Sequence, residues 1–382
     1  MSEGAPPFGV YVHIPFCRHR CDYCAFATWD DRPHLLDSYV EGLRLEIEAA
    51  AGGLAEATSV FFGGGTPSLL TPAQVASVLD GLRLAAGAEV SLECNPETVD
   101  AERLVGYRHA GVTRISLGAQ SLADHVLVAL DRAHDGATVV GAAEAVAAGG
   151  FDSWNLDLIY GTVGETLDDW TGTLARAVEL GPPHVSAYGL TVEAGTPLAA
   201  DTSRFPDDDD QADKYHLAEE ALGSAGLVNY EVSNWARPGH ECRHNLLHWH
   251  QGDYRGFGCA AHSHQAGRRW WNVRTPERYL ALVAAGEPVV AADERLDEAG
   301  RRLEGLQLLL RTRRGVPASA LDADGLEGLV EARDDRLVLT ADGRLLANEV
   351  SLRLVAEPEV RRRTDRASAP DKALRPKRCP PS

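Results

Sequence analysis

Three cysteines with the spacing C-x3-C-x2-C lie near the N-terminus, in the stretch HIPFCRHRCDYCAF at 13–26. Cys17, Cys21 and Cys24, here called the cysteine trio, converge on one centre only if the loop between them wraps around it. Thiolates suit zinc and iron–sulfur clusters. An iron–sulfur cubane normally takes four cysteines. Three cysteines therefore indicate a cluster with one iron left open for a small chelating ligand, as in catalytic metal sites.

A structural zinc site is the alternative for the same spacing, with His13 or His19 as the fourth ligand. The chain has seven cysteines, an odd number, and the other four are far apart. These four are Cys94, Cys242, Cys259 and Cys379. Because thiols stay reduced in the cytosol, the trio indicates metal binding rather than a disulfide.

The elements that must position the trio are short apolar runs that alternate with helical patterns. The predicted strands are 9–14, 59–62, 89–93, 113–117, 154–159 and 184–190, and the predicted helices are 36–50, 72–84, 101–110, 136–148, 167–180 and 212–225. Alternating strands and helices predict βαβ units and a parallel sheet. Six such units predict an α/β fold with an incomplete (β/α)6 barrel, and a flat doubly wound sheet is the alternative.

Glycine turns or polar side chains follow nearly every predicted strand. In strand order, these are the trio, then Gly63-Gly64-Gly65-Thr66-Pro67, then Glu93 and Asn95, then Gly118 and Gln120, then Asn155 and Asp157, and finally Tyr188 to Thr191. The carboxyl ends of strands are where chemistry gathers in parallel β/α folds. We therefore expect these residues to share one pocket.

The trio, with Tyr23 just before its third cysteine and a β/α array behind it, resembles the radical S-adenosylmethionine (SAM) superfamily. In that family the methionine amino and carboxyl groups of SAM chelate the open iron of a [4Fe–4S] cluster. The resemblance implies that Gly64, Gly65 and Thr66 form the loop next to the methionine amino group. Glycine suits that place because it lacks a Cβ and lets backbone approach closely.

The resemblance also implies cofactor contacts from the other strand ends. Glu93 would accept hydrogen bonds from ribose hydroxyls, Arg132 would pair with the methionine carboxylate, and Tyr11 would pack against the cofactor. The implied set of SAM contacts also includes Tyr23, Gln120, Asp157 and Thr191.

Longer motifs resemble the coproporphyrinogen III dehydrogenase-like branch of that superfamily, over about residues 8–355. They are Tyr11 to Cys17, Phe62 to Ser68, Glu93-Cys-Asn-Pro, Asp157-Leu-Ile-Tyr-Gly and Tyr230-Glu-Val-Ser-Asn-Trp-Ala. The branch holds oxygen-independent dehydrogenases, which decarboxylate two propionates by radical chemistry. It also holds the HemW-type haem chaperones, which bind haem and hand it to respiratory apoproteins.

Three features favour the chaperone group. Phe26 stands where the dehydrogenase has an extra cysteine, and 230–235 fits a chaperone motif. The stretch Arg243-His-Asn-Leu-Leu-His-Trp fits a second one, except that His248 replaces a tyrosine. The resemblance implies His244 as the haem ligand, and imidazole is a natural axial ligand for haem iron. His248 and Trp249 are further haem candidates, and the indole of Trp249 can stack on a porphyrin.

Five segments are expected along the chain. They are a flexible N-terminus at 1–8, the barrel at 9–228, a haem-motif or connecting segment at 229–290, a small helical or winged-helix-like domain at 291–356, and a disordered basic tail at 357–382.

The formal net charge of −19 argues against nucleic acid as a partner and against an anionic membrane surface. No apolar run approaches a membrane span, and 1–7 lacks the features of a signal peptide. A cytoplasmic protein is therefore expected. The tail is a solvated extension in the simplest interpretation, and electrostatic contact with a membrane is the functional alternative.

The sequence hypothesis is a haem chaperone without an assigned catalytic residue, with a [4Fe–4S] cluster, SAM and haem as its cofactors. Its expected partners are a haem donor, haem-accepting respiratory proteins and a second copy of the chain. Two alternatives stay open. One is a radical SAM enzyme acting on coproporphyrinogen III or another tetrapyrrole, and the other is a zinc-stabilised protein that binds a metabolite.

Overall fold

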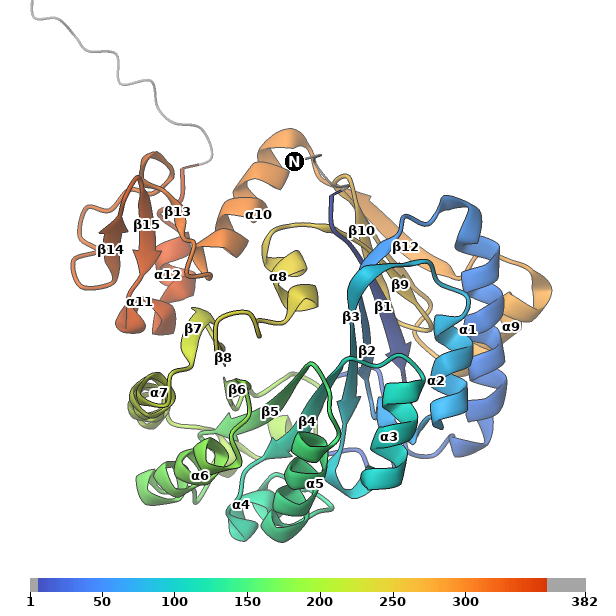
Figure 1. The fold of residues 1–382 in the computed structure, drawn as a ribbon. Coiled ribbons are helices and arrows are strands. Elements are labelled where there is room, and N and C mark those ends of the chain that lie inside the picture. The colour runs from blue at the N-terminus through green and yellow to red at the C-terminus, as the bar shows by residue number, and fades with distance from the viewer. Residues whose placement is uncertain (1–5, 356–382) are drawn as a thin grey trace, which may run out of the picture.

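A computed structural model describes residues 6–355 of the chain. Six parallel strands lie side by side in chain order and curl into an open barrel (Figure 1). They are β1 (Phe8–Ile14), β2 (Ala57–Gly64), β3 (Leu84–Cys94), β4 (Arg114–Gln120), β5 (Ser153–Tyr160) and β6 (His184–Gly189). The predicted α/β class with an incomplete barrel is confirmed.

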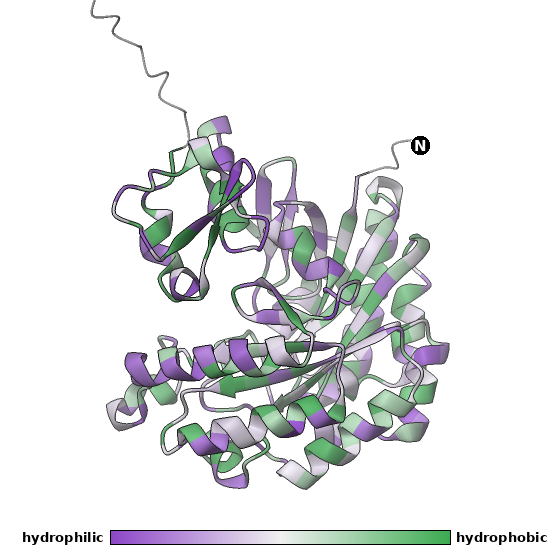
Figure 2. Cartoon of the chain, turned by 60° about the vertical axis from the view of Figure 1, so that its left-hand side comes forward, coloured by the Kyte–Doolittle hydropathy of each residue, from purple (hydrophilic) through white to green (hydrophobic). Residues whose placement is uncertain are grey.

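Helices cover the convex face of this sheet (Figure 1). They are α1 (Leu36–Ala50), α2 (Pro72–Leu79), α3 (Ala101–His109), α4 (Asp124–Ala129), α5 (Gly136–Ala148), α6 (Leu167–Leu180) and α7 (Asp208–Ser224). Between them lies the main core, in which Val12, Val60 and Leu92 are fully buried. Hydrophobic residues gather along these strands and the helices beside them (Figure 2).

The bounds of α1, α5 and α6 are those that the sequence predicts, α3 ends one residue earlier than predicted, and α2 and α7 differ more. Helix α2 ends at Leu79, because the chain must turn through Asp80 and Gly81 to enter β3 at Leu84. Helix α7 starts four residues before the predicted 212, at Asp208. There the Asp207 side chain accepts a hydrogen bond from Asp210 N, and caps of this kind fix a helix start. The short α4 was not predicted.

The segment 229–290 adds strands to both edges of the barrel sheet rather than only connecting two units. It contributes β7 (Val228–Glu231), β8 (Asn234–Ala236), α8 (Arg243–Trp249), β9 (Asp253–Phe257), β10 (His262–Gln265), β11 (Arg268–Asn272) and α9 (Pro276–Ala285), and β12 (Val290–Arg295) follows. The resulting sheet has twelve strands in the order β12-β11-β10-β9-β1-β2-β3-β4-β5-β6-β8-β7. Strand β9 pairs in parallel with β1.

Helix α8 lies on the concave side of the curled sheet (Figure 1). Its Leu247 packs so closely on two glycines that a Cβ on either Gly9 or Gly252 would lie 2.4 Å from a Leu247 methyl carbon. Side chains at these positions would push the helix away. The glycines therefore allow α8 to fill the inside of the barrel next to β1.

The C-terminal part forms a separate small module. It contains α10 (Glu298–Leu310), β13 (Val316–Pro317), β14 (Val330–Arg333), β15 (Arg336–Leu339), α11 (Ala341–Leu345) and α12 (Ala347–Ser351). Its three strands form their own antiparallel sheet, and Leu310, Val316 and Val350 belong to a hydrophobic cluster distinct from the barrel core. Asp342 and Gly343 lie in α11.

No helix within 6–355 is long and apolar enough to cross a membrane. The predictions for the first five residues and for the basic tail lie outside the described residues.

Candidate functional site

The carboxyl ends of the parallel strands surround a cavity of about 460 Å³. The cysteine trio lines it together with every residue of the implied SAM set except Tyr11. These residues are Tyr23, Gly64, Gly65, Thr66, Glu93, Gln120, Arg132, Asp157 and Thr191. The fold thus gathers one loop and several strand ends into a single site of suitable size for a small-molecule cofactor.

Tyr11 does not line the cavity but supports it from β1. Its hydroxyl hydrogen-bonds the Nδ1 of His13 at 3.1 Å. A Cβ on Gly63 would lie 3.0 Å from the Tyr11 ring and 3.2 Å from Glu93 Oε2. Tyr11 therefore packs behind the glycine loop, near Glu93.

The glycine loop packs directly on the loop that carries the trio. Gly65 N donates to Ile14 O and Thr66 N donates to Phe16 O, both at 2.8 Å. A Cβ on Gly65 would lie 2.6 Å from Phe16 O and 3.0 Å from Cys17 Sγ, so no side chain fits there. Close approach of these two loops explains the need for glycine, and it leaves the trio facing the cavity.

Arg132 links the trio to the third and fourth strand ends. Its guanidinium donates to Cys21 Sγ at 3.3 Å, to Asn95 Oδ1 at 3.0 Å and to Gly118 O at 3.2 Å. The Arg132 Nε is buried and has no partner among the described residues. Burial raises the pKa of the Cys17 thiol to about 11. Burial also raises the pKa of Cys21, although the Arg132 charge opposes this.

The cysteine trio is the candidate site for a cluster, and His13 and His19 are the candidate zinc ligands. Within 6–355, no group of three or more His, Cys, Asp or Glu side chains is placed to hold a single metal. A cubane binds each cysteine through a different iron, so its cysteine sulfurs stand farther apart than those around one zinc ion. The candidate zinc ligands have other partners: His13 Nε2 hydrogen-bonds Ala27 O and His19 Nε2 contacts Asp131 Oδ2, each at 2.9 Å.

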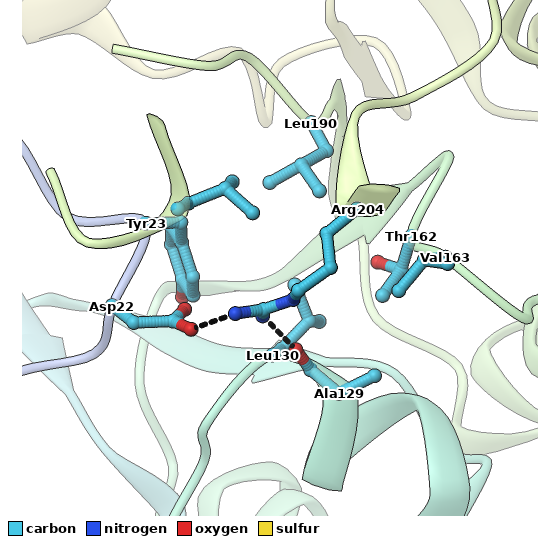
Figure 3. A pocket seen from close by; sticks show the side chains of 9 residues that line it. Asp22, Tyr23, Ala129, Leu130, Thr162, Val163, Leu190 and Arg204 are labelled. Carbon is cyan, nitrogen blue, oxygen red and sulfur yellow. Dashed lines mark hydrogen bonds and ion pairs between the residues drawn. The ribbon is translucent and has the colours of Figure 1, made fainter. Parts of the chain in front are cut away.

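The loop that carries the cysteine trio, here called the cluster loop, is held at a second, smaller pocket (Figure 3). Arg204 pairs with the Asp22 carboxylate and donates to Ala129 O at 2.7 Å. The backbone oxygen of Asp22 accepts a hydrogen bond from Leu198 N at 3.1 Å. The segment after β6 therefore fixes the cluster loop. Sequence reasoning missed Arg204, because no local motif marks it.

Two half-buried carboxylates, Glu93 and Asp157, face the cavity from β3 and β5. Burial raises the pKa of Glu93 to about 8, and the charge of Asp157 adds to the effect. Burial also raises the pKa of Asp157, although Ser116 Oγ at 2.9 Å and Asn155 Nδ2 at 2.8 Å donate to it. Gly64 N donates to Glu93 Oε2 at 3.2 Å. The pair offers acceptors that suit hydroxyl groups and cations.

Backbone strain marks the same cavity. Gln120, at the end of β4, has a φ of 65°, and Asp131, just before Arg132, has a φ of 54°. Left-handed backbone at a residue other than glycine costs about 1–3 kcal/mol and persists where the surroundings enforce it, often at functional sites. Both residues therefore turn the chain at the points where side chains enter the cavity.

The three candidate haem residues lie together on α8, outside the cofactor cavity. His244 is 4% exposed and stacks on Phe61, with 5.4 Å between ring centroids. Its Nδ1 hydrogen-bonds Ser59 Oγ at 3.0 Å. The His248 ring lies 4.9 Å from the His244 ring. The structure thus places the haem motif inside the barrel sheet, where the cofactor cavity does not reach it.

Each of these three side chains has a buried nitrogen without a partner among the described residues. The nitrogens are His244 Nε2, His248 Nε2 and Trp249 Nε1. Burial lowers the pKa of His244 well below its usual range and that of His248 to about 4. Unpaired buried nitrogens are rare and need an explanation. Neutral imidazoles of this kind fit the chemistry of an iron ligand.

The N-terminus of α8 is held by a residue that sequence reasoning did not single out. Glu89 Oε1 accepts hydrogen bonds from Arg243 N at 2.9 Å and from His244 N at 3.3 Å. Glu89 lies on β3, far from α8 in the sequence, so only the fold brings them together. A carboxylate at a helix N-terminus satisfies its free amides.

Comparison with known proteins first defines the class. The family model described as "Radical SAM superfamily" matches residues 11–177. The structure of coproporphyrinogen III oxidase (HemN) from Escherichia coli aligns with a TM-score of 0.79 at 23% identity, covering 91% of this chain and 89% of that chain. The protein has the radical SAM fold.

The relatives then define the family. The protein named heme chaperone HemW of Mycobacterium tuberculosis is 45% identical over 367 residues, covering 90% of this chain and 94% of the relative. Its namesake in Escherichia coli is 42% identical over 266 residues, covering 67% of this chain and 70% of the relative. The chain belongs to the HemW family, and the resemblance found in its motifs is confirmed.

Proposed function

We propose that the protein is a haem chaperone, which binds haem on α8 and delivers it to respiratory haem proteins. The observation that carries this proposal is its 45% identity with a protein named heme chaperone along nine-tenths of the chain. That similarity includes the haem motif on α8 and extends well beyond the part that matches the superfamily at large.

In this proposal the cysteine trio holds three irons of a [4Fe–4S] cluster, and SAM chelates the fourth. Cluster and SAM together supply redox and radical chemistry when they are bound. Glu93 and Asp157 are acceptors for the ribose hydroxyls, and Arg132 is the partner of the methionine carboxylate. The cavity size and the glycine loop support this assignment, as does the Arg132 Nε, which has no partner in the described part of the chain.

His244 is the proposed haem ligand. Its Nε2 is buried without a partner among residues 6–355, and burial keeps the ring neutral. If the Ser59 hydroxyl accepts from Nδ1, the lone pair stays on Nε2, as iron binding requires. Because the ring is 4% exposed, haem reaches it only after α8 shifts. Trp249, with its own unpaired nitrogen, is the nearby stacking candidate.

A haem titration tests the proposal. The cluster-reconstituted protein is titrated anaerobically with haem and followed by absorbance, alongside His244→Ala and the matched control His250→Ala. His250 is the exposed residue that follows α8. We expect wild type and control to give the same haem spectrum, and His244→Ala to bind at least tenfold more weakly. Unchanged binding by His244→Ala would overturn the assignment of the ligand, and His248→Ala would then be tested.

We further propose that the protein does not decarboxylate coproporphyrinogen III. Phe26 is 67% exposed and lines the cofactor cavity, at the position of the dehydrogenase's extra cysteine. Incubation of the reconstituted protein with coproporphyrinogen III, SAM and a reductant should yield no protoporphyrinogen. Robust turnover, coupled to release of 5′-deoxyadenosine, would instead identify a radical enzyme.

The proposed place of action is the cytoplasm, with a homodimer as the proposed assembly. Reduced thiols are needed to hold the cluster, and that compartment supplies them. If the haem acceptor lies in a membrane, the basic tail is the proposed contact with anionic lipid. If removal of 361–382 leaves sedimentation with anionic vesicles unchanged, the membrane contact through the tail is wrong.

A further inference from the structure

We propose that His184 and Tyr230 are positioning residues that couple Asp157 in the cofactor cavity to helix α8. The coupling concerns the same site as the proposed function and rests on it for the identity of the α8 ligand. The connection itself is a chain of hydrogen bonds through three buried side chains, with a half-buried residue at each end. It begins on β5, crosses β6 and β7, and ends at Asn245, the neighbour of His244.

The chain has four links. Asn155 Nδ2 donates to Asp157 Oδ1 at 2.8 Å. His184 Nδ1 and Asn155 Oδ1 lie 2.6 Å apart, and His184 Nε2 and the Tyr230 hydroxyl lie 2.9 Å apart. Asn245 Nδ2 donates to the Tyr230 hydroxyl at 3.2 Å. The links thus connect a cavity carboxylate to the haem-motif helix without a gap.

The donors in this chain have only one consistent arrangement. The Asp157 carboxylate needs a donor, which orients the Asn155 amide with its oxygen toward His184. His184 must then carry its proton on Nδ1. His184 is 1% exposed, and burial lowers its pKa well below the usual range, so the ring is neutral and accepts at Nε2. Tyr230 therefore donates to His184 and accepts from Asn245.

In each of the four hydrogen bonds, the donor therefore lies on the Asn245 side and the acceptor lies on the Asp157 side. Hydrogen bonds in such a series polarise one another in a buried environment, and a buried donor left unpaired is costly. When a ligand hydroxyl competes for Asp157, the strength of the first link changes, and the change is passed on to Asn245. The ligand state of the cavity thereby biases the position of α8, which must move for His244 to be reached.

Two sequence motifs that the cofactor site does not use meet in this chain. Tyr230 opens the motif at 230–235, and Asn245 follows His244 in the motif at 243–249. Glu231 reinforces the junction, because its Oε1 lies 3.4 Å from Asn245 Nδ2. In addition, Arg313 N donates to Tyr230 O at 2.9 Å, which attaches the C-terminal module to the same point. A shared role in coupling accounts for both motifs.

Hydrogen exchange tests the coupling without haem. The full chain, with its cluster reconstituted anaerobically, is measured with and without SAM in wild type, Tyr230→Phe and Tyr279→Phe. Tyr279 is the matched control, because it is buried and its hydroxyl donates to Glu46 Oε2 at 2.8 Å, on the helix-covered side. We expect SAM to change exchange of the 243–249 amides roughly fivefold or more in wild type and control.

Tyr230→Phe should abolish this response while still binding SAM in equilibrium dialysis. Asn245→Ala, a half-buried position at the other end of the chain, should do the same and serves if Tyr230→Phe folds poorly. A wild-type response in both variants, or no response in wild type, would overturn the proposal.

Haem-binding measurements on the same variants distinguish failure of the coupling from failure of the chaperone proposal. The haem affinity of wild type should change with SAM, and that change should vanish in Tyr230→Phe, whose affinity for haem alone persists. If wild type does not bind haem through His244 while the exchange response is present and lost in Tyr230→Phe, the haem assignment is wrong and the coupling stands. If haem binds through His244 without any effect of SAM or Tyr230, the coupling is wrong and the chaperone function stands.

Discussion

At the scale of single residues, the cofactor cavity depends on a glycine without a Cβ and on two carboxylates that line it. Gly65 leaves just enough room for Phe16 O and Cys17 Sγ, so the cysteine loop and the glycine loop share one surface. The Glu93 and Asp157 carboxylates line the same cavity, and the charge of Asp157 helps to raise the pKa of Glu93. Both features lead to measurable consequences.

Gly65→Ala should reduce cluster loading. The added methyl group would meet Phe16 O at 2.6 Å, which forces the cysteine loop outward and costs about 1–3 kcal/mol. Iron and acid-labile sulfide per chain after reconstitution measure the effect. Gly141→Ala is the control, because a Cβ there meets nothing within 4 Å in α5, and it should load normally. Normal loading of Gly65→Ala would show that the loops can separate without harm.

Glu93→Gln should make stability less dependent on pH. The folded-state pKa of Glu93 is about 8, above the ordinary 4.5, so the folded protein binds the extra proton in that window. The free energy of unfolding therefore falls as pH rises, by up to about 1.4 kcal/mol per pH unit. Glutamine does not ionise. The difference in Tm between metal-free Glu93→Gln and metal-free wild type should rise, in favour of the variant, from about pH 5 to about pH 8. Parallel curves of Tm against pH would contradict this.

At the scale of elements, the short α8 is the feature on which the haem proposal depends. It has no capping side chain of its own, and Cys242 precedes it. Glu89 on β3 takes that role by accepting from Arg243 N and His244 N. The sheet therefore holds the helix through one carboxylate, through Leu247 on Gly9, and through Asn245 on Tyr230.

Glu89→Ala should loosen α8 selectively. Loss of a cap costs about 0.5–2 kcal/mol, so the amides of 243–249 should exchange faster, and haem should bind faster because His244 is reached more often. Exchange mass spectrometry and stopped-flow absorbance measure the two effects. Asp135→Ala removes the cap of α5 and is the matched control, since it should loosen 136–148 alone. Slower haem binding by Glu89→Ala would mean that the held helix is the binding form.

At the scale of the whole molecule, several polar contacts join two separate hydrophobic cores. The barrel core and the cluster around Leu310 share no residue. Arg344 connects them by pairing with Glu219 at 2.8 Å and donating to the Tyr215 hydroxyl at 2.6 Å. The backbone hydrogen bond from Arg313 N to Tyr230 O is a further contact, and Tyr230 belongs to the hydrogen-bond chain between Asp157 and Asn245. The C-terminal module is therefore placed to respond to α8.

Leu310→Ala should destabilise the C-terminal module alone. Leu310 is fully buried in that cluster, and a large-to-small change there costs about 2–5 kcal/mol. Hydrogen exchange should rise across 316–350, while β2 and β3 keep their protection. The control Leu352→Ala, at a side chain that is 83% exposed, should change nothing. Equal loss of protection in the barrel strands would show that the two cores unfold together.

The sequence by itself determined the features that are local. The cysteine spacing, the glycine loop and the polar strand ends are all short patterns, and each lies at the cavity. Helices α1, α5 and α6 have the predicted bounds, which apolar periodicity indicates. Asp135 caps α5 and Thr166 caps α6, and both caps are local in the sequence. The alternation of strands and helices predicted a parallel β/α sheet, with a partial barrel as the expectation and a flat doubly wound sheet as the alternative.

Only the tertiary structure decided which distant residues meet. Glu89 reaches Arg243, Arg204 reaches Asp22, and β9 pairs with β1, although each pair is separated by more than a hundred residues. Residue types and local periods carry no information on such pairs, since these depend on how the sheet curls and which strands extend its edges. The same physical reason hid the path from Asp157 to Asn245. The motifs that contain Tyr230 and Asn245 do not indicate that these residues meet, and no motif marks His184 between Tyr230 and Asn155.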